Sequence, residues 1–371
     1  MPHEFRIAYF AHAIRSDWNN GNAHFQRGLL RALGNCGHEV SVFEPEDGWS
    51  IRNLCREAKG EIALRDFAET YPELSITSYC TEVFDTPDRL RSMIRGADVV
   101  ILHEWNPPSL AHSLLDLRND LGFRLLFHDT HHRALSARDQ IGLFGLDRFD
   151  GIIAFDEVLR NIYRNELNIR RVWTLHEAAD TDVFRPRRIR NAENDVVWIG
   201  NWGDEERTRE ICHFLIEPAA ALRTHNFIVY GVRYPPEAIL ALQGAGIRYS
   251  GYLPNLDGPS VYGLAQLTVH IPRRQYAQTM RGIPTIRVFE ALACGIPLIS
   301  APWDDCEKLF RKDDFLTVRD SLEMASAITR LLSDEDAARE QAARGLETVR
   351  ARHTCRHRAE QLTQICEELV R

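Results

Sequence analysis

The chain has 371 residues, of which 44% are hydrophobic and 26% charged, and its formal net charge is −8 at pH 7. This length predicts two or three domains, and the composition is typical of a globular protein. The negative charge argues against a nucleic-acid partner, because proteins that bind nucleic acids usually present a basic face.

The first half of the chain alternates short apolar runs with amphipathic segments. A strand over 5–10, a polar loop over 16–22, a helix that ends at Gly37 and a strand over 39–43 form one βαβ unit. Gly21 lies in the turn from strand to helix, but the G-x-G-x-x-G fingerprint of dinucleotide sites is absent. The charged region 50–85 predicts one or two helices with an inserted extended piece. Further strands are predicted over 98–102, 123–127, 151–155 and 171–175, and helices over 88–95, 108–121 and 157–166.

A proline-marked, arginine-rich stretch predicts an inter-domain linker at about 180–193. A second series of strands follows, predicted over 195–199, 227–230, 247–250, 267–271, 298–300 and 315–318. Helices are predicted over 205–223, 236–243 and 259–265, and the tail 321–371 is helical. Alternating strands and helices indicate parallel sheets covered on both faces, so the fold class is α/β with two Rossmann-like halves.

The segment 287–297, R-V-F-E-A-L-A-C-G-I-P, predicts a helix that ends at its Gly-x-Pro. Pro284 is expected in the first helical turn, where the free N–H groups form an anion site. Glu290 is expected on a different face from the packing residues. It could accept hydrogen bonds from two ribose hydroxyls, or it could form a surface pair with Arg287 worth about a few tenths of a kcal/mol.

Polar residues follow several predicted strands, at 103–106, 128–133, 200–207 and 272–274. Ligands of open parallel sheets bind beyond the carboxyl ends of the strands, so these residues are candidates for a site. Arg207 and Arg287 could stabilise a leaving diphosphate together with a helix N-terminus. His128, Asp129 and His132 could ligate a metal ion, but their spacing does not favour it, and the D-x-D at 180–182 is more simply part of the linker.

The eight cysteines are scattered and form no C-x-x-C pair, so no zinc ribbon or thioredoxin-type site is indicated. The N-terminal residues do not have the pattern of a signal peptide, and no run of about 18 apolar residues predicts a transmembrane segment. We therefore expect a cytoplasmic protein with reduced cysteines.

The chain resembles the GT-B glycosyltransferases of the retaining group 1 type, and its second half is closest to the CgeB-like spore-maturation branch. The matching segments are A-D-V-V-I-L-H-E-W at 97–105, D-G-I-I-A-F at 150–155, H-E-A-A-D-T-D-V-F at 176–184, G-N-W with Arg207 at 200–207, S-G-Y-L at 250–253 and the helix at 287–297. The last segment is the specific one, and the resemblance covers nearly the whole chain except about 44–90.

The resemblance implies a GT-B fold in which two Rossmann-like parallel-sheet domains face each other across a cleft. They are an acceptor-side domain at 1–185 and a nucleotide-sugar-binding domain at 186–352, with a helix at 353–371 that crosses back to the first. The donor is a nucleoside-diphosphate sugar, the acceptor is a glycan, a protein or a small molecule, and no metal or other cofactor is expected. His103 and His128 are the catalytic candidates. The donor-binding candidates are Gly21, Gly200, Arg207, Arg274, Thr285, Arg287 and Glu290.

The sequence departs from the family pattern at four positions. The first glutamate of the family's E-x7-E motif corresponds to Gly282, and the glycine three residues later is Thr285. In the diphosphate pair, the lysine is replaced by an arginine at best, and Asn201 takes the place of the arginine. Retaining glycosyl transfer is the expected activity. A catalytically silent protein that binds a nucleotide sugar or a glycan is the alternative, and a nucleotide-sugar epimerase is a third possibility.

Overall fold

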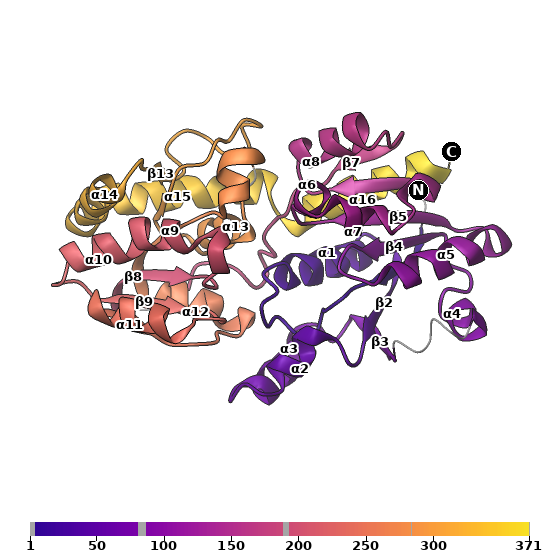
Figure 1. The fold of residues 1–371 in the computed structure, drawn as a ribbon, viewed down its shortest axis with the longest axis horizontal. Coiled ribbons are helices and arrows are strands. Elements are labelled where there is room, and N and C mark those ends of the chain that lie inside the picture. Colours follow the sequence, from indigo (N-terminus) through magenta and orange to yellow (C-terminus); the bar gives the residue numbers. More distant parts are fainter. Residues whose placement is uncertain (1–3, 81–86, 188–192, 283, 371) are drawn as a thin grey trace. The chain divides into compact units, whose positions relative to one another are not determined.

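The computed structural model describes residues 4–80, 87–187, 193–282 and 284–370. The chain divides into two compact units, of which unit 1 contains Met1–Glu177 and Cys355–Arg371, and unit 2 contains Ala178–Thr354. Residues 188–192 of the predicted linker lie outside the described residues, and so does Ile283 in the loop before the helix at 287–297. The last helix, α16 (Cys355–Val370), packs against α1 (Ala23–Asn35) within unit 1 (Figure 1).

The described part of unit 1 is built on a parallel sheet of seven strands in the order β3-β2-β1-β4-β5-β6-β7. The strands are β1 (Arg6–Phe10), β2 (Glu39–Pro45), β3 (Ser75–Tyr79), β4 (Val99–His103), β5 (Arg124–Asp129), β6 (Gly151–Ala154) and β7 (Val172–Thr174). Every residue of β4 is buried, as expected for a parallel sheet with both faces covered. The register pairs His103 with His128, so the carboxyl ends of β4 and β5 lie side by side.

Helices cover this sheet, and their ends follow local sequence. α5 begins at Pro108, whose missing N–H costs nothing in the first turn, and it ends before Gly122, which has a φ of +77°. α8 begins after Asp156, whose side chain accepts a hydrogen bond from the Leu159 N–H. The bounds of these two helices are Pro108–Leu121 for α5 and Glu157–Asn161 for α8. Unit 1 also contains α2 (Trp49–Leu54), α3 (Gly60–Thr70), α4 (Pro87–Met93), α6 (Arg133–Ser136) and α7 (Arg138–Gly142).

The described part of unit 2 contains a parallel sheet of six strands in the order β10-β9-β8-β11-β12-β13. The strands are β8 (Asn194–Ile199), β9 (Phe227–Tyr230), β10 (Ile247–Tyr249), β11 (Ala265–His270), β12 (Leu298–Ser300) and β13 (Leu316–Thr317). The helices are α9 (Thr208–Ile211), α10 (Glu217–Ala221), α11 (Pro236–Gly244), α12 (Gly258–Gly263), α13 (Ile286–Cys294), α14 (Ser321–Ser333) and α15 (Glu335–Arg352). Trp198, Phe214 and Phe227 belong to its core. No helix in the described ranges combines the length and the apolar character needed to cross a bilayer.

α13 corresponds to the predicted helix at 287–297 and ends, as predicted, at Gly295, which has a φ of +66°. Its beginning was predicted wrongly, because Pro284 lies before the helix and Thr285 is its extended N-cap residue. The expected polar face is also wrong. Every residue of α13 except Arg287 is buried, because α12, α15 and the strands β11 and β12 pack around the helix.

Candidate functional site

In unit 2, hydrogen bonds of His270 connect the beginning of α13 with the ends of β11 and β12. The Ser300 hydroxyl donates to the Ala301 carbonyl, so it accepts the proton on Nδ1 of His270, 2.8 Å away. Nε2 of His270 then accepts a hydrogen bond from the Thr285 hydroxyl at 3.0 Å. Burial, and secondly the charge of Arg207, lower the pKa of His270 to about 3, so its imidazole is neutral. His270 was not singled out from the sequence, although it lies at the carboxyl end of a predicted strand.

Glu290 is fully buried in α13 and is hydrogen-bonded from two sides. Nη1 of Arg287 donates to one carboxylate oxygen, and Nδ2 of Asn255 donates to the other at 3.1 Å. The Glu290–Arg287 pair predicted from the sequence therefore exists, but its carboxylate is in the interior and not on the surface. The Arg287 side chain keeps 29% of its surface exposed.

Arg207 lies close to two more arginines. Burial, followed by the charges of Arg273 and Arg287, lowers the pKa of Arg207 to about 10. Its guanidinium donates to the carbonyls of Asn201 and Ile271, while its buried Nε has no hydrogen-bond partner in the described residues. Arg273 is paired with Glu206 and Arg287 with Glu290, whereas Arg207 forms no ion pair with a carboxylate in the described residues, so Arg207 is the guanidinium best suited to an anionic ligand.

The other polar atoms of unit 2 that are buried without a hydrogen-bond partner in the described residues include Oε1 of Gln275 and Nε1 of Trp303. The Trp303 ring lies 6.4 Å from the ring of His270, centroid to centroid. Buried polar groups normally have partners, so unpaired ones near a cluster of arginines favour a polar ligand. No sequence motif pointed to either residue.

The remaining donor candidates lie in different surroundings. Gly200 is a packing position, because a Cβ there would lie 2.6 Å from the Trp198 ring. Arg274 forms an ion pair with Glu210, its Nε lying 3.0 Å from the carboxylate. Gly21 belongs to unit 1, in the turn before α1. The donor roles of these three residues stay predictions.

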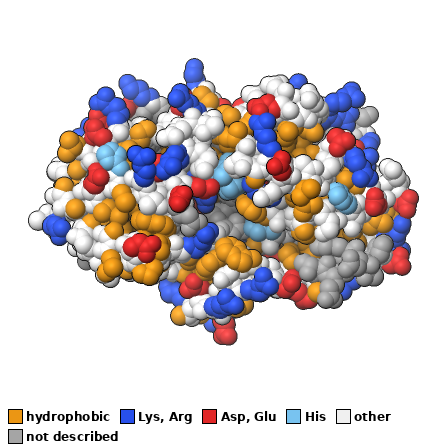
Figure 2. Space-filling model, viewed as in Figure 1, with side chains coloured by type: hydrophobic (Ala, Val, Ile, Leu, Met, Phe, Trp, Pro, Cys, Tyr) orange, Lys and Arg blue, Asp and Glu red, His pale blue; other side chains and the backbone are white. Residues whose placement is uncertain are grey.

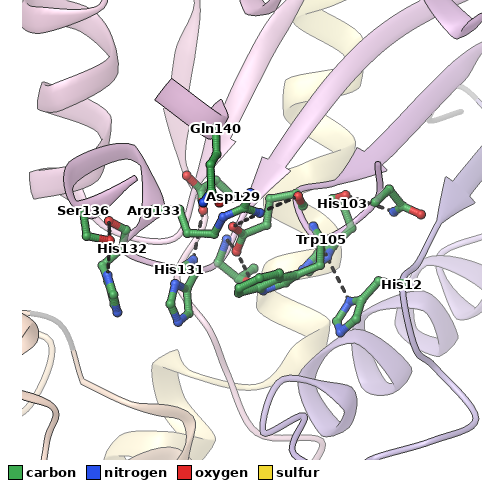
Figure 3. A network of polar contacts seen from close by, with 12 residues as sticks. His12, His103, Trp105, Asp129, His131, His132, Arg133, Ser136 and Gln140 are labelled. Carbon is green, nitrogen blue, oxygen red and sulfur yellow. Dashed lines mark hydrogen bonds and ion pairs between the residues drawn. The ribbon is translucent and has the colours of Figure 1, made fainter. Parts of the chain in front are cut away.

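In unit 1, the catalytic candidates His103 and His128 lie at the ends of β4 and β5, where both are buried. Nδ1 of His103 is 3.2 Å from Nδ1 of His12, and its Nε2 is 3.0 Å from the Thr130 hydroxyl (Figure 3). Nδ1 of His128 is 2.8 Å from the Tyr9 hydroxyl, and its buried Nε2 has no partner in the described residues. Burial lowers the pKa of both, to about 4 for His128, so both imidazoles are neutral at pH 7. Their catalytic role stays a prediction.

A buried carboxyl pair lies beside these histidines. Burial and the charge of Asp129 raise the pKa of Glu104 well above its usual value. Burial also raises the pKa of Asp129 to about 6, although the hydrogen bond that its carboxylate accepts from Tyr163 lowers this pKa. Nη1 of Arg133 is 3.6 Å from the Glu104 carboxylate. The sequence placed Glu104, Asp129 and Arg133 at strand ends but did not predict that they form one network.

The metal hypothesis for His128, Asp129 and His132 gains no support from their contacts. Asp129 accepts hydrogen bonds from the His131 N–H and the Tyr163 hydroxyl, and Nδ1 of His132 is 2.7 Å from the Ser136 hydroxyl. Within the described ranges, no three His, Cys, Asp or Glu residues are arranged to hold a metal ion.

Gly282 explains one departure from the family pattern. It has a φ of +101°, and a Cβ there would lie 2.5 Å from Sγ of Cys306 and 3.1 Å from the Asp304 carbonyl oxygen. Non-glycine residues rarely adopt this backbone conformation. A glutamate at position 282 would therefore require a different backbone conformation at this position.

Comparisons with known proteins agree with this architecture. The model of a family described as glycosyl transferase-like matches residues 207–364. Sucrose-phosphate synthase from Thermosynechococcus elongatus is 15% identical, with a TM-score of 0.67 over 99% of each chain. HepE of Anabaena, solved with UDP and glucose, is 12% identical, with a TM-score of 0.72 over 98% of this chain and 100% of its own. No curated protein matches the chain.

An alpha-glucosyltransferase in complex with UDP-glucose and DNA containing an abasic site is 14% identical, with a TM-score of 0.71 over 98% of this chain and all of its own. The chain has the GT-B fold. The match to the glycosyl transferase-like family model lies mostly in unit 2, and the solved structures of similar fold include complexes with UDP and UDP-glucose. The GT-B fold predicted from the sequence is therefore confirmed.

Proposed function

We propose that this protein is a glycosyltransferase that moves a sugar from a nucleoside-diphosphate sugar to an acceptor hydroxyl, with retention of configuration. The observation that carries the proposal is the cluster of Arg207, Arg273 and Arg287 in unit 2, with a buried, unpartnered Nε on Arg207. A diphosphate gains negative charge as its bond to the sugar breaks, and guanidiniums held in place stabilise that charge. A sugar donor such as UDP-glucose, present in complexes of two similar structures, supplies such a leaving group.

In this mechanism Arg207 contacts the diphosphate, and the beginning of α13 adds the partial positive charge of a helix N-terminus. Glu290 accepts hydrogen bonds from the ribose hydroxyls, sharing its carboxylate with Arg287. The arginines supply the charge that a divalent ion supplies in other transferases, so we propose metal-independent transfer. Hexosyl transfer, a relation to the CgeB-like branch and a cytoplasmic place of action are further parts of the proposal that come from the sequence alone.

Thermal-shift and calorimetric titration with UDP test the proposal. Arg207→Ala should weaken UDP binding about tenfold or more, because a charge-assisted hydrogen bond contributes about 1.5–3 kcal/mol. Arg209→Ala is the matched control, because Arg209 is exposed and only two residues away. Equal UDP affinity in the parent and the Arg207→Ala variant would contradict the proposed diphosphate contact.

Slow release of UDP from UDP-sugars without an acceptor separates a transferase from the alternative. A transferase hydrolyses its donor slowly, whereas a silent binding protein with the same fold releases no UDP. Binding without any release from a panel of UDP-, GDP- and ADP-sugars would therefore reject the enzymatic proposal in favour of the binding protein.

Metal-independence is tested with EDTA. Transfer activity that EDTA abolishes and one divalent ion restores would reject metal-independent transfer.

A further inference from the structure

Trp105 is part of a row of rings at the carboxyl end of the sheet in unit 1 (Figure 3). Its ring centroid lies 6.4 Å from that of His12 on one side and 5.1 Å from that of His131 on the other. We call these three residues the aromatic ledge. Trp105 is 45% exposed although Glu104 and Asn106, its neighbours in the chain, are buried. Tryptophan combines a large apolar ring with a polar N–H, so an exposed tryptophan flanked by two imidazoles can serve as a binding surface.

Arg133 holds the indole of Trp105 in place. The guanidinium carbon lies 4.5 Å from the centre of the Trp105 ring, a distance at which a cation and an aromatic face attract each other. Arg133 is itself fixed, because it donates to the Glu104 carbonyl at 3.0 Å and to the Gln140 side chain at 3.3 Å. The ledge is therefore rigid, and little side-chain freedom is lost when a ligand stacks on it.

The buried carboxyls of unit 1 complete this support. Glu104 and Asp129 lie in the interior, where charged groups are costly, and the Glu104 carboxylate is 3.6 Å from Nη1 of Arg133. Tyr163 in turn donates a hydrogen bond to Asp129. A well-packed apolar interior would be at least as stable, so this network is better explained by the position in which it holds Arg133 and Trp105.

We propose that the aromatic ledge binds a saccharide. If the proposed glycosyltransferase function is correct, this saccharide is the acceptor; the saccharide site itself does not depend on that function. The face of a pyranose ring carries C–H groups that pack on an indole, while its hydroxyls lie around the rim. His12 and His131 flank Trp105 where those hydroxyls would lie. Nδ1 of His12 is 3.2 Å from Nδ1 of His103, so Nε2 of His12 is the ring nitrogen that can pair with a hydroxyl. His12 is neutral at pH 7, because burial lowers its pKa to about 4.

A nucleobase is the competing ligand, because bases also stack on tryptophan. The charge near the ledge does not favour a nucleic acid, because Arg133 lies between the buried carboxyl groups of Glu104 and Asp129 and its guanidinium is engaged by the Glu104 carbonyl and the Gln140 side chain. On the face of the molecule in Figure 2, Lys and Arg side chains lie among Asp and Glu side chains and form no basic stripe. A neutral, hydroxyl-rich ligand fits these observations better than a polyanion.

The test uses the full chain and saturation-transfer NMR with defined probes: the methyl α- and β-glycosides of glucose, galactose and mannose, and adenosine. We expect at least one glycoside to receive saturation at the C–H protons of one ring face. Trp105→Ala should weaken this binding by roughly two- to tenfold, the range for an aromatic stacking contact. Trp105→Phe should restore part of the affinity. Trp49→Ala is the matched control, because Trp49 is 50% exposed in the same unit and lies on α2.

Glycoside binding that is weakened in Trp105→Ala and unchanged in Trp49→Ala supports the inference. No glycoside binding in the parent chain, or binding that Trp105→Ala leaves unchanged, overturns it, and so does adenosine binding at Trp105 in place of the glycosides. UDP binding is measured on the same samples. If UDP binds and no glycoside does, the saccharide site alone is wrong. If glycosides bind at Trp105 and UDP does not bind, the proposed transferase function is wrong and the sugar site remains.

Discussion

The carboxylate of Glu290 accepts hydrogen bonds from Arg287 and Asn255 inside unit 2. Glu290→Ala removes the proposed ribose contact and leaves the Arg287 guanidinium without its buried partner. We expect UDP binding to weaken by about 2–3 kcal/mol, the contribution of charge-assisted hydrogen bonds to a diol. Isothermal titration with UDP measures this change.

Glu340→Ala is the control for Glu290→Ala, because Glu340 pairs with Arg344 four residues later on an exposed face of α15. That variant should bind UDP like the parent chain. Circular dichroism checks that both variants are folded. If Glu290→Ala binds UDP with unchanged affinity, Glu290 has only a structural role in α13.

The lowered pKa of the buried His270 makes the stability of unit 2 depend on pH. Its folded-state pKa of about 3 is below the ordinary value of about 6.5, so the unfolded chain binds a proton between these values and the folded chain does not. Its contribution to stability is therefore present above pH 6.5 and is lost as the pH falls. Between pH 6.5 and 5 the loss amounts to about 2 kcal/mol.

Urea unfolding of the parent chain and of His270→Asn at both pH values measures this contribution. The variant should lose less stability than the parent chain between pH 6.5 and 5, since asparagine does not titrate. An identical pH dependence in the two proteins would show that His270 is not buried in its neutral form. His12 and His128, whose pKa values are also lowered to about 4, act in the same direction in unit 1.

Residue patterns predicted where the polar groups lie along the chain, but not which of them meet. His103 and His128 were assigned to strand ends because polar residues followed apolar runs. The contact of His103 with His12 depends on the parallel pairing of β1 with β4, which no local pattern encodes. In the same way, Tyr163 reaches Asp129 across 34 positions of the chain.

At the scale of elements, Gly345 allows α15 to pack closely against α13. A Cβ at this position would lie 2.6 Å from Cδ2 of Leu292 and 3.0 Å from the Asp314 carbonyl oxygen. Gly345→Ala should therefore push the two helices apart and destabilise unit 2 by about 1–3 kcal/mol, the usual cost of overpacking. Because α13 carries Glu290, the variant should also bind UDP more weakly. Chemical denaturation and UDP titration measure the two effects.

Gly244→Ala is the matched control in the same unit. Gly244 is the last residue of α11, and a Cβ there has nothing within 4 Å. Alanine has the higher helix propensity, so this variant should be neutral or more stable than the parent by less than about 1 kcal/mol. Equal losses in the two variants would mean that helix backbone effects, and not the contact of α15 with α13, determine the result.

Regular elements were predicted best where the apolar pattern is strong. The helix predicted over 108–121 corresponds to α5, and the strands predicted over 227–230 and 298–300 correspond to β9 and β12. The helix predicted near 205–223 is found as one continuous helical run from Thr208 to Ala221, in which a π-helical segment over Cys212–Ile216 joins α9 to α10. The short helices α6 and α7 after β5 were missed, because segments of four or five residues show no periodicity.

For the molecule as a whole, the chain leaves unit 1 at Glu177 and returns to it at Cys355. Arg358 fixes the returning helix α16, since its Nε donates to the His176 carbonyl at 2.8 Å. Burial lowers the pKa of Arg358 to about 10. Each unit has its own sheet and its own buried core, so we expect calorimetry of the full chain to resolve two unfolding transitions.

Variants assign the two transitions without dividing the chain. Gly345→Ala changes a helix contact in unit 2 and should lower one midpoint. Arg358→Met removes a charged hydrogen bond in unit 1 and should lower the other, by the equivalent of about 1.5–3 kcal/mol. If both substitutions lower the midpoint of the same transition, the whole chain unfolds cooperatively. The two units would then not unfold independently of each other.

UDP then reports which unit binds the donor. The proposed donor contacts of Arg207, Arg287 and Glu290 all lie in unit 2, so UDP should raise the transition that Gly345→Ala lowers. A ligand at about 100 times its Kd stabilises the folded state by about 2.7 kcal/mol, which corresponds to roughly 5–10 °C for a unit of this size. The transition that Arg358→Met lowers should stay within about 1 °C, because ligand linkage acts only on the unit that holds the ligand. A UDP-dependent shift confined to that second transition would place the nucleotide in unit 1 and reject the arginine cluster as its site.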